Sequence, residues 1–320
     1  MRGCGRGIQT VHWLAYHLCD MFMMTSTFND CLSPYHLRQT HNRVEAWSIK
    51  RLPFEPTHWL KNFRQELRTA ARQLRSDSDQ LLHAIYASPV RELCDTENVL
   101  LYNVGLSHFA EAARYGLRFE RAFQIIVACP HPLTTQPLHY HDYCIAPSGS
   151  PFQHWNKGGT LASWNFTSNA KAIKQCALVW YAMKTGKITT SNIHHTVPPR
   201  QYGLQLQLDV PYRDRVRLPE IVKPLFDGII SALHYHDGTD QAELSRRVAT
   251  LIGAGANDIS ALLQEKTATV LGRRKLLHRF RDNVQWNPQD DSCFVGQLHL
   301  NETGRSDWVV HGELFEVNLK

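Results

Sequence analysis

The chain has 320 residues, of which 43% are hydrophobic and 20% are charged. A chain of this length buries roughly 75% of the surface that its unfolded form exposes, so the composition predicts a globular protein and excludes a disordered or fibrous one. The 35 Lys and Arg residues against 29 Asp and Glu residues leave a formal net charge of +6. This surplus permits a polyanionic partner but falls short of a dedicated polybasic binder.

The amino-terminal segment 1–50 is expected to form a poorly packed arm. Its apolar stretch at 8–24 is interrupted by polar residues such as His17 and Asp20, so neither a signal peptide nor a membrane span fits it. A translation start at one of the methionines of 21–24 is an alternative, in which case the residues before it do not belong to the protein. No later segment is apolar over eighteen residues, so no membrane association is expected. The eight cysteines are scattered and contain no CxxC pair, which favours a reducing, cytoplasmic location.

Residues 51–97 are predicted to form a helical hairpin. Thr57 is suited to cap a first helix, because apolar residues recur at helical spacing over 59–74. A second helix is expected over 76–86. The opposite side of the first helix carries a stripe of basic residues three or four positions apart, namely Lys61, Arg64, Arg68, Arg72 and Arg75.

Residues 98–199 are predicted to form an α+β region without a visible internal period. Apolar runs predict strands over 99–102, 117–129, 138–145 and 160–167, and helical spacing predicts helices over 106–115 and 170–184.

Residues 200–320 are predicted to form a carboxyl-terminal α+β core. Leucines alternate with polar residues over 203–210, a pattern typical of a half-buried strand. Helices are expected over 219–234 and 241–251, followed by a closing hairpin of strands at 293–300 and 308–317. Because strands and helices interleave without a regular βαβ rhythm, the expected fold class is α+β with a mixed sheet and packed helices.

The segment 204–240 resembles the core of the RusA-like Holliday-junction resolvases. That family carries the pattern D-L-D-N-x-x-K-x-x-x-D-A-L after a strand and a basic loop, and this chain has R-L-P-E-I-V-K-P-L-F-D-G-I. Lys223, Phe226 and Asp227 match in identity and spacing, and Asp237 falls at the first position of a later acidic pair. The resemblance implies a RusA-like core, nucleic acid as partner, and catalytic roles for the matching lysine and aspartates.

Three positions depart from the family pattern. Its two leading carboxylates are replaced by Arg217 and Pro219, and the second acid of the later pair is Gly238. Those carboxylates carry the metal chemistry of the family, because Mg²⁺ needs several hard oxygen ligands before it can activate water and clamp a phosphate. The alternative interpretation of this segment is an ordinary amphipathic helix with an apolar core face.

Glu220, Asp237 and Asp240 are the candidate ligands of a metal site that has shifted from the family's position. Glu220 and Asp227 are two helical turns apart, about 10.5 Å along a helix axis, so they share a face but do not easily share one ion. The sequence therefore favours a decayed site without Mg²⁺-dependent cleavage. The cofactor is otherwise open, and Mg²⁺ is expected if a shifted site functions.

A second candidate site is a group of Cys and His residues in one short stretch. Zinc accepts thiolate and imidazole ligands in a tetrahedron, and its candidate ligands are Cys129, His131, His139, His141 and Cys144. The spacing lacks the CxxC knuckle of structural zinc sites. Half-buried strand residues are the alternative interpretation.

A second basic stretch supplies further candidates for phosphate contact: Arg273, Arg274, Lys275 and Arg279. Both basic stretches are also compatible with solvated faces. The leading hypothesis is a nucleic-acid-contacting protein related to structure-specific RusA-like endonucleases, with a decayed or shifted metal site. The alternative is a non-enzymatic scaffold or assembly subunit that binds another protein or a second copy of itself.

Overall fold

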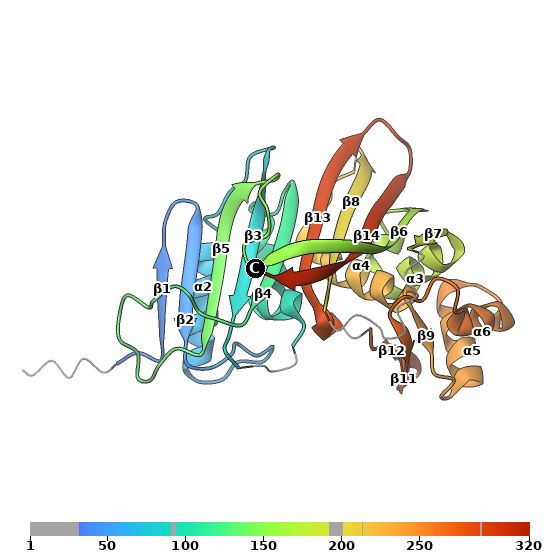
Figure 1. The fold of residues 1–320 in the computed structure, drawn as a ribbon, viewed down its shortest axis with the longest axis horizontal. Helices are drawn as coiled ribbons and strands as arrows, with labels where there is room; N and C mark the ends of the chain where they lie inside the picture. The colour runs from blue at the N-terminus through green and yellow to red at the C-terminus, as the bar shows by residue number, and fades with distance from the viewer. Residues whose placement is uncertain (1–31, 91–93, 192–200, 213, 289) are drawn as a thin grey trace, which may run out of the picture. The chain divides into compact units, whose positions relative to one another are not determined.

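The computed structural model describes residues 32–90, 94–191, 201–212, 214–288 and 290–320. Ten strands form one mixed sheet, with the spatial order β1, β2, β5, β3, β4, β13, β8, β14, β6 and β7 (Figure 1). Their bounds are β1 Tyr35–Gln39, β2 Arg43–Ser48, β3 Gln80–Ala87, β4 Gly116–Ala122, β5 His139–Pro147, β6 Trp155–Ser168, β7 Lys187–Thr190, β8 Tyr202–Pro211, β13 Cys293–Thr303 and β14 Trp308–Leu319. The predicted α+β class and its mixed sheet are confirmed.

Five helices, four single helical turns and two pairs of short strands accompany the main sheet in the described residues. The helices are α2 Trp59–Ala71, α3 Cys176–Thr185, α4 Leu218–Ala232, α5 Gln241–Ile252 and α6 Ala256–Gln264, with single turns at η1 Asn98–Tyr102, η2 Leu106–Phe109, η3 Ala172–Lys174 and η4 Asp290–Ser292. Two further pairs of strands are β9 His234–His236 with β10 Gly272–Arg274, and β11 Leu277–Phe280 with β12 Asn283–Trp286. None of these helices combines the length and the hydropathy that a bilayer crossing requires.

The two halves of the sheet repeat one arrangement of strands. In the first half, β3 is parallel to β4 and antiparallel to β5, which is antiparallel to β2. In the second half, β8 is parallel to β13 and antiparallel to β14, which is antiparallel to β6. The halves join through the antiparallel pair of β4 and β13. This strand order is that of two copies of one strand arrangement, related by a twofold axis between β4 and β13. The crossover from β3 to β4 contains η1, and the equivalent crossover from β8 to β13 contains α4.

The main core lies on the face of the sheet that the helices cover. Leu204, Leu206 and Leu208 of β8 are buried there, together with Phe63 of α2 and Phe226 of α4. The intervening residues of β8 are polar and lie on the other face, as the alternation of the sequence predicts. Among the described residues, the apolar clusters on that second face are smaller.

The predicted helical hairpin is half wrong. Its first helix is confirmed as α2, but the expected second helix at 76–86 is the strand β3. Seven of the eight residues of β3 are buried, because the strand lies inside the sheet between β4 and β5. Such a continuous apolar run fits a strand buried on both faces as well as a buried helix, and only the neighbouring strands decide between them.

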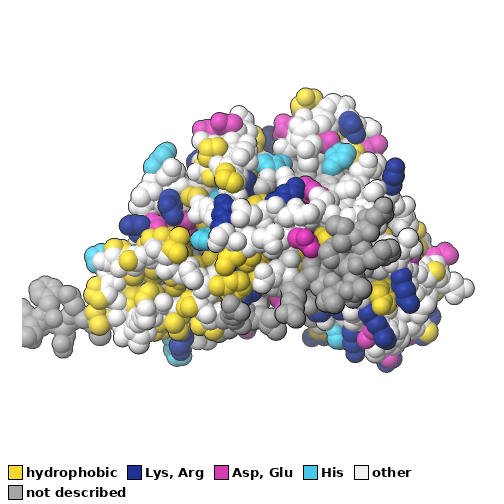
Figure 2. Space-filling model, viewed as in Figure 1, with side chains coloured by type: hydrophobic (Ala, Val, Ile, Leu, Met, Phe, Trp, Pro, Cys, Tyr) yellow, Lys and Arg dark blue, Asp and Glu magenta, His cyan; other side chains and the backbone are white. Residues whose placement is uncertain are grey.

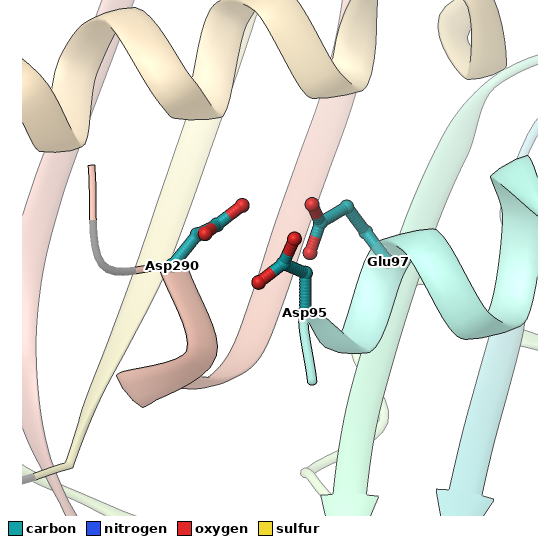
Figure 3. Close-up of side chains that lie close together, drawn as sticks. All are labelled: Asp95, Glu97 and Asp290. Carbon is teal, nitrogen blue, oxygen red and sulfur yellow. The ribbon is translucent and has the colours of Figure 1, made fainter. Parts of the chain in front are cut away.

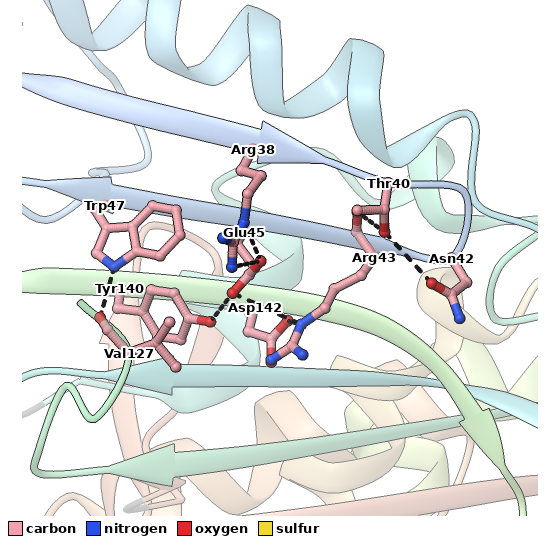
Figure 4. Close-up of polar contacts among 9 residues, drawn as sticks. All are labelled: Arg38, Thr40, Asn42, Arg43, Glu45, Trp47, Val127, Tyr140 and Asp142. Atoms are coloured by element: carbon pink, nitrogen blue, oxygen red, sulfur yellow. Dashed lines mark hydrogen bonds and ion pairs between the residues drawn. The ribbon is translucent and has the colours of Figure 1, made fainter. Parts of the chain in front are cut away.

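The expected amino-terminal arm also needs correction. Residues 1–31 lie outside the described residues, but β1 and β2 are part of the main sheet and Trp47 is fully buried. Polar contacts fasten β1 to β2 and β2 to β5 (Figure 4). Arg43 donates two 2.8 Å hydrogen bonds to the Asp142 carboxylate, and Tyr140 donates one of 2.8 Å to Glu45. From Pro34 to Lys320 the chain forms one compact unit instead of the three regions expected.

Three other expectations fail in detail. The strand expected over 99–102 is the helical turn η1, and the helix expected over 106–115 shortens to η2. The strands expected near 293–300 and 308–317 exist as β13 and β14, but they are not a hairpin. The strand β8 pairs with both of them and lies between them.

Candidate functional site

Helix α4 carries the two residues on which the sequence resemblance rests. The apolar residues of this helix face the core, and Lys223 and Asp227 lie one turn apart beside them. Lys223 Nζ donates a 3.1 Å hydrogen bond to Asp227 Oδ1. Their spacing of four residues on a helix places them on the same face.

Three carboxylates from distant parts of the chain join this pair. Lys223 Nζ lies 3.0 Å from Asp290 Oδ2, 3.2 Å from Glu97 Oε1 and 3.9 Å from Asp95 Oδ2. The side chains of Asp95, Glu97 and Asp290 point toward one another (Figure 3). We call these five residues, the four carboxylates and Lys223, the acidic centre. It contains the only group of three or more Asp, Glu, His and Cys side chains in the described residues whose ligand atoms could share a metal ion.

The acidic centre lies where the two crossovers of the sheet meet. Asp95 and Glu97 precede η1 in the crossover from β3 to β4, and α4 belongs to the crossover from β8 to β13. Thr96 Oγ1 donates a 3.4 Å hydrogen bond to the Cys293 carbonyl, and Asn98 Nδ2 donates one of 2.6 Å to Asp95. These bonds hold the acidic segment against the start of β13 and orient its side chains.

Burial and charge shift the protonation of the acidic centre strongly. Burial raises the pKa of Asp95 and Asp227 to about 7, and the nearby Asp290 charge adds to the shift of both. Burial also raises the pKa of Glu97 well above its usual range. Although burial opposes it, the surrounding carboxylates hold the pKa of Lys223 above its usual range. Against burial, Lys223 and a hydrogen bond with Asp95 lower the pKa of Asp290.

The charges of the acidic centre do not balance. Four carboxylates surround one ammonium group, and their side chains are between 3% and 29% exposed. Burial, together with this excess of negative charge, accounts for the raised pKa values of Asp95, Glu97 and Asp227. A divalent cation would compensate the excess and displace the protons, because hard cations such as Mg²⁺ prefer carboxylate oxygens.

A cavity of about 650 Å³ opens onto the acidic centre. Asp95, Lys223, Asp227 and Asp290 line one part of it. Other lining residues carry positive charge or aromatic rings, namely Arg51, Arg274, Phe54 and Trp286. The cavity therefore offers solvent access to the carboxylates and groups that could contact a phosphate or a base.

The other two predicted catalytic acids lie elsewhere. Glu220 pairs with Arg217 at 3.3 Å and lies 4.0 Å from Lys174. Asp237 accepts a 2.9 Å hydrogen bond from the Thr239 backbone N–H and lines a different cavity. The shifted site expected from Glu220 and Asp237 is therefore not assembled, whereas Asp227 has other acidic neighbours.

The predicted zinc cluster is not assembled either. His139 and His141 of β5 lie on the helix-covered face, where His139 bonds to the Tyr86 hydroxyl at 2.8 Å. Cys144 lies on the opposite face, because successive side chains of a strand alternate. His131 lies beside His36, with ring centroids 4.5 Å apart. The half-buried strand interpretation fits Cys144 alone among the five, because His139 and His141 are buried strand residues and Cys129 and His131 lie outside the strands.

His141 should make the fold sensitive to acid. Its Nε2 atom has no partner in the described structure, and burial, with the neighbouring His139, lowers its pKa to about 3. The unfolded chain binds a proton near pH 6.5, so stability that is present above that pH is lost as the pH falls toward 3. Relative to the His141→Leu variant, the native chain should lose about 2 kcal/mol of unfolding free energy between about pH 7 and about pH 5.

Urea unfolding of both proteins across this range measures the difference. The matched control is His41→Leu, which removes an exposed histidine of the same sheet region. Equal pH profiles for the native chain and the His141→Leu variant would contradict the assignment of His141 as a buried neutral group.

The predicted basic residues partly serve the fold. Arg68 donates a 2.5 Å hydrogen bond to the Val104 carbonyl, and Arg72 donates one of 2.9 Å to His108. In the second stretch, Arg274 bonds to Asn287 and Arg279 to Asp240. On the face drawn in Figure 2, Lys and Arg side chains are scattered among acidic and uncharged ones. Contact of these residues with nucleic acid stays a prediction.

Sequence reasoning missed Asp95, Glu97 and Asp290. The available signal was weak: an acid-x-acid pattern in C-D-T-E-N and an acidic pair in Q-D-D-S, each beside an apolar run. Comparisons of this chain with protein-family models, curated proteins and solved structures found no match. The case for a function therefore rests on the geometry of the acidic centre and its cavity.

Proposed function

We propose that this protein is a divalent-metal-dependent nuclease, related to the RusA-like endonucleases, whose metal site has shifted to the acidic centre. The observation that carries the proposal is the convergence of Asp95, Glu97 and Asp290 on the pair formed by Lys223 and Asp227. The sequence favoured a decayed site, because the acids close to Lys223 in the chain are too few and too far apart to bind one divalent cation. The carboxylates that the motif lacks are supplied by Asp95 and Glu97 of the other crossover and by Asp290 at the end of the crossover that contains α4.

The chemistry of the centre suits phosphodiester hydrolysis. Asp95, Glu97 and Asp290 would hold Mg²⁺ or Mn²⁺, which when bound activates water and stabilises the charge of the phosphate. Asp227 keeps the Lys223 ammonium in place through the 3.1 Å hydrogen bond. The ammonium group is then positioned to stabilise negative charge that develops on a phosphate oxygen.

Positive groups near the cavity support nucleic acid as the substrate. Arg51 and Arg274 line the cavity that leads to the acidic centre. The stripe on α2 and the residues near β10 would add weaker, nonspecific phosphate contacts. All five cysteines in the described part of the chain are free, which suits the cytoplasmic location that forms part of this proposal.

A protein-binding scaffold is the second candidate. It is favoured by β1 and β7, which lie at the two ends of the described sheet and so offer edges for another strand. The two candidates differ in their response to salt. Binding to phosphates weakens steeply between about 50 and about 200 mM salt, whereas strand pairing with a protein does not.

The deciding experiment incubates the full chain with branched, duplex and single-stranded DNA and RNA, with Mg²⁺, with Mn²⁺ or with EDTA. We expect cleavage of at least one of these substrates that requires the metal, together with salt-sensitive binding in EDTA. Absence of cleavage across the whole panel, with no stabilisation of the protein by Mn²⁺ in thermal unfolding, would overturn the nuclease proposal.

A further inference from the structure

An exposed pair of aromatic rings lies beside the cavity of the acidic centre. Phe54 is 56% exposed and Tyr102 is 44% exposed, yet their rings stack with centroids 5.2 Å apart and planes inclined by 16°. Phe54 also lines the cavity that opens onto Lys223 and Asp227. Within the described residues, no other aromatic ring pair has both rings exposed.

The chain holds this pair in place from two sides. Arg64 Nη1 donates a 3.0 Å hydrogen bond to the Phe54 carbonyl, and Asn103 Nδ2 donates one of 2.9 Å to the Leu52 carbonyl. Leu52 itself is fully buried in the main core. A preformed ring surface binds a flat ligand with little loss of conformational entropy.

The surroundings of the pair select the kind of ligand. Arg51 and Arg274 on the cavity wall supply positive charge for contact with a phosphate, beside the carboxylates of the acidic centre. A flat aromatic surface beside cationic groups is the combination by which proteins bind single-stranded nucleic acid, because bases stack on the rings and phosphates contact the cations. Inside a duplex the base faces are covered by the neighbouring bases, so an unpaired base, whose faces are open, is the ligand that suits this surface.

We propose that Phe54 and Tyr102 form a stacking subsite for an unpaired nucleobase of single-stranded DNA or RNA next to the acidic centre. This assignment adds a binding site for the substrate to the proposed nuclease. It rests on that proposed function, because the neighbouring carboxylates act on the substrate only if the protein is a nuclease. It narrows the substrate class to strands with an unpaired segment. A phosphate beside the stacked base would then enter the cavity lined by Lys223 and Asp290.

The test is a binding titration with the full chain in EDTA, so that it does not depend on cleavage. Three fluorescent probes are compared by anisotropy: a single-stranded oligonucleotide, its duplex, and a strand of the same length with abasic positions. We expect the native chain to prefer the single strand with bases. Phe54→Ala should weaken that binding about tenfold, as for the loss of one stacked base, and should leave abasic binding unchanged.

Two further variants separate stacking from loss of structure. Phe54→Trp keeps an aromatic surface and should retain the preference for bases. Tyr212→Ala removes a 71% exposed aromatic residue outside the cavity and should bind all probes like the native chain. Equal weakening of abasic and normal strands by Phe54→Ala would overturn the subsite, as would a native chain that binds all three probes equally.

The outcomes for the subsite and for the nuclease are distinguishable. Base-dependent binding in EDTA without cleavage in Mn²⁺ would support the subsite and contradict the nuclease. Metal-dependent cleavage at the same rate in the native chain and the Phe54→Ala variant would support the nuclease and contradict the subsite. A Phe54→Ala variant that changes only the oligomeric state, measured by light scattering, would assign the rings to a protein interface and overturn the stacking proposal.

Discussion

The Asp290→Asn and Glu97→Gln variants should lose metal-dependent cleavage by at least about a hundredfold, because each removes a charged oxygen ligand from the acidic centre. Asp290 Oδ2 is 3.0 Å and Glu97 Oε1 is 3.2 Å from Lys223 Nζ. Either substitution keeps the size of the side chain, so the variants should remain folded. Initial rates of oligonucleotide cleavage in Mn²⁺ measure the loss.

The matched controls are Glu220→Gln and Asp237→Asn. Both acids belong to the segment that resembles the resolvases, but Glu220 pairs with Arg217 and Asp237 bonds to Thr239. These variants should cleave at the native rate. The opposite pattern, with loss in the controls and native rates in the Asp290 and Glu97 variants, would place catalysis outside the acidic centre.

The Lys223→Met variant should be destabilised by about 3 kcal/mol at about pH 8, because it leaves buried carboxylates without their cation. The defect should shrink at about pH 5.5. Burial raises the pKa of Asp95 and Asp227 to about 7, and losing Lys223 raises both values further. The folded state then binds more protons than the unfolded state, so the free energy of unfolding falls as the pH rises.

Mn²⁺ should restore stability to the Lys223→Met variant more than to the native chain, since a divalent cation replaces the missing positive charge. Lys184→Met is the control, because the Lys184 side chain is also buried but has Glu265, at 3.3 Å, as its one acidic partner among the described residues. It should show neither the pH-dependent loss nor the rescue by Mn²⁺. Thermal unfolding at both pH values, with and without Mn²⁺, measures these effects. Equal responses of the two lysine variants would show that the acidic centre is no cation site.

Local patterns of the sequence suffice for some elements. The leucines of β8 alternate with polar residues, and the apolar residues of α4 recur at helical spacing. Such patterns record which side of an element faces the core, and they do not depend on the neighbouring strands. The same spacing placed Lys223 and Asp227 on one helix face, and their 3.1 Å contact follows from it.

Other elements depend on their position in the sheet. The strand β3 is buried on both faces, so its apolar run carries no alternation that distinguishes it from a helix. The strands β13 and β14 are joined by a short connection and look like a hairpin, but β8 pairs with both. Pairing between strands far apart in the chain is settled by the packing of the whole sheet, and no local pattern encodes it.

The acidic centre likewise depends in part on local sequence spacing and in part on tertiary packing. Lys223 and Asp227 are four residues apart, and helical geometry alone brings them together. Glu97 lies 126 positions from Lys223 and reaches it because the crossover from β3 to β4 meets the crossover from β8 to β13 at the middle of the sheet. Asp290 lies 67 positions from Lys223, at the end of the same crossover as α4, where the chain returns to the start of β13. The sequence by itself determined that Lys223 and Asp227 form an ion pair on one face of α4. Only the tertiary structure decided which carboxylates surround that pair, because their proximity depends on chain topology rather than on spacing.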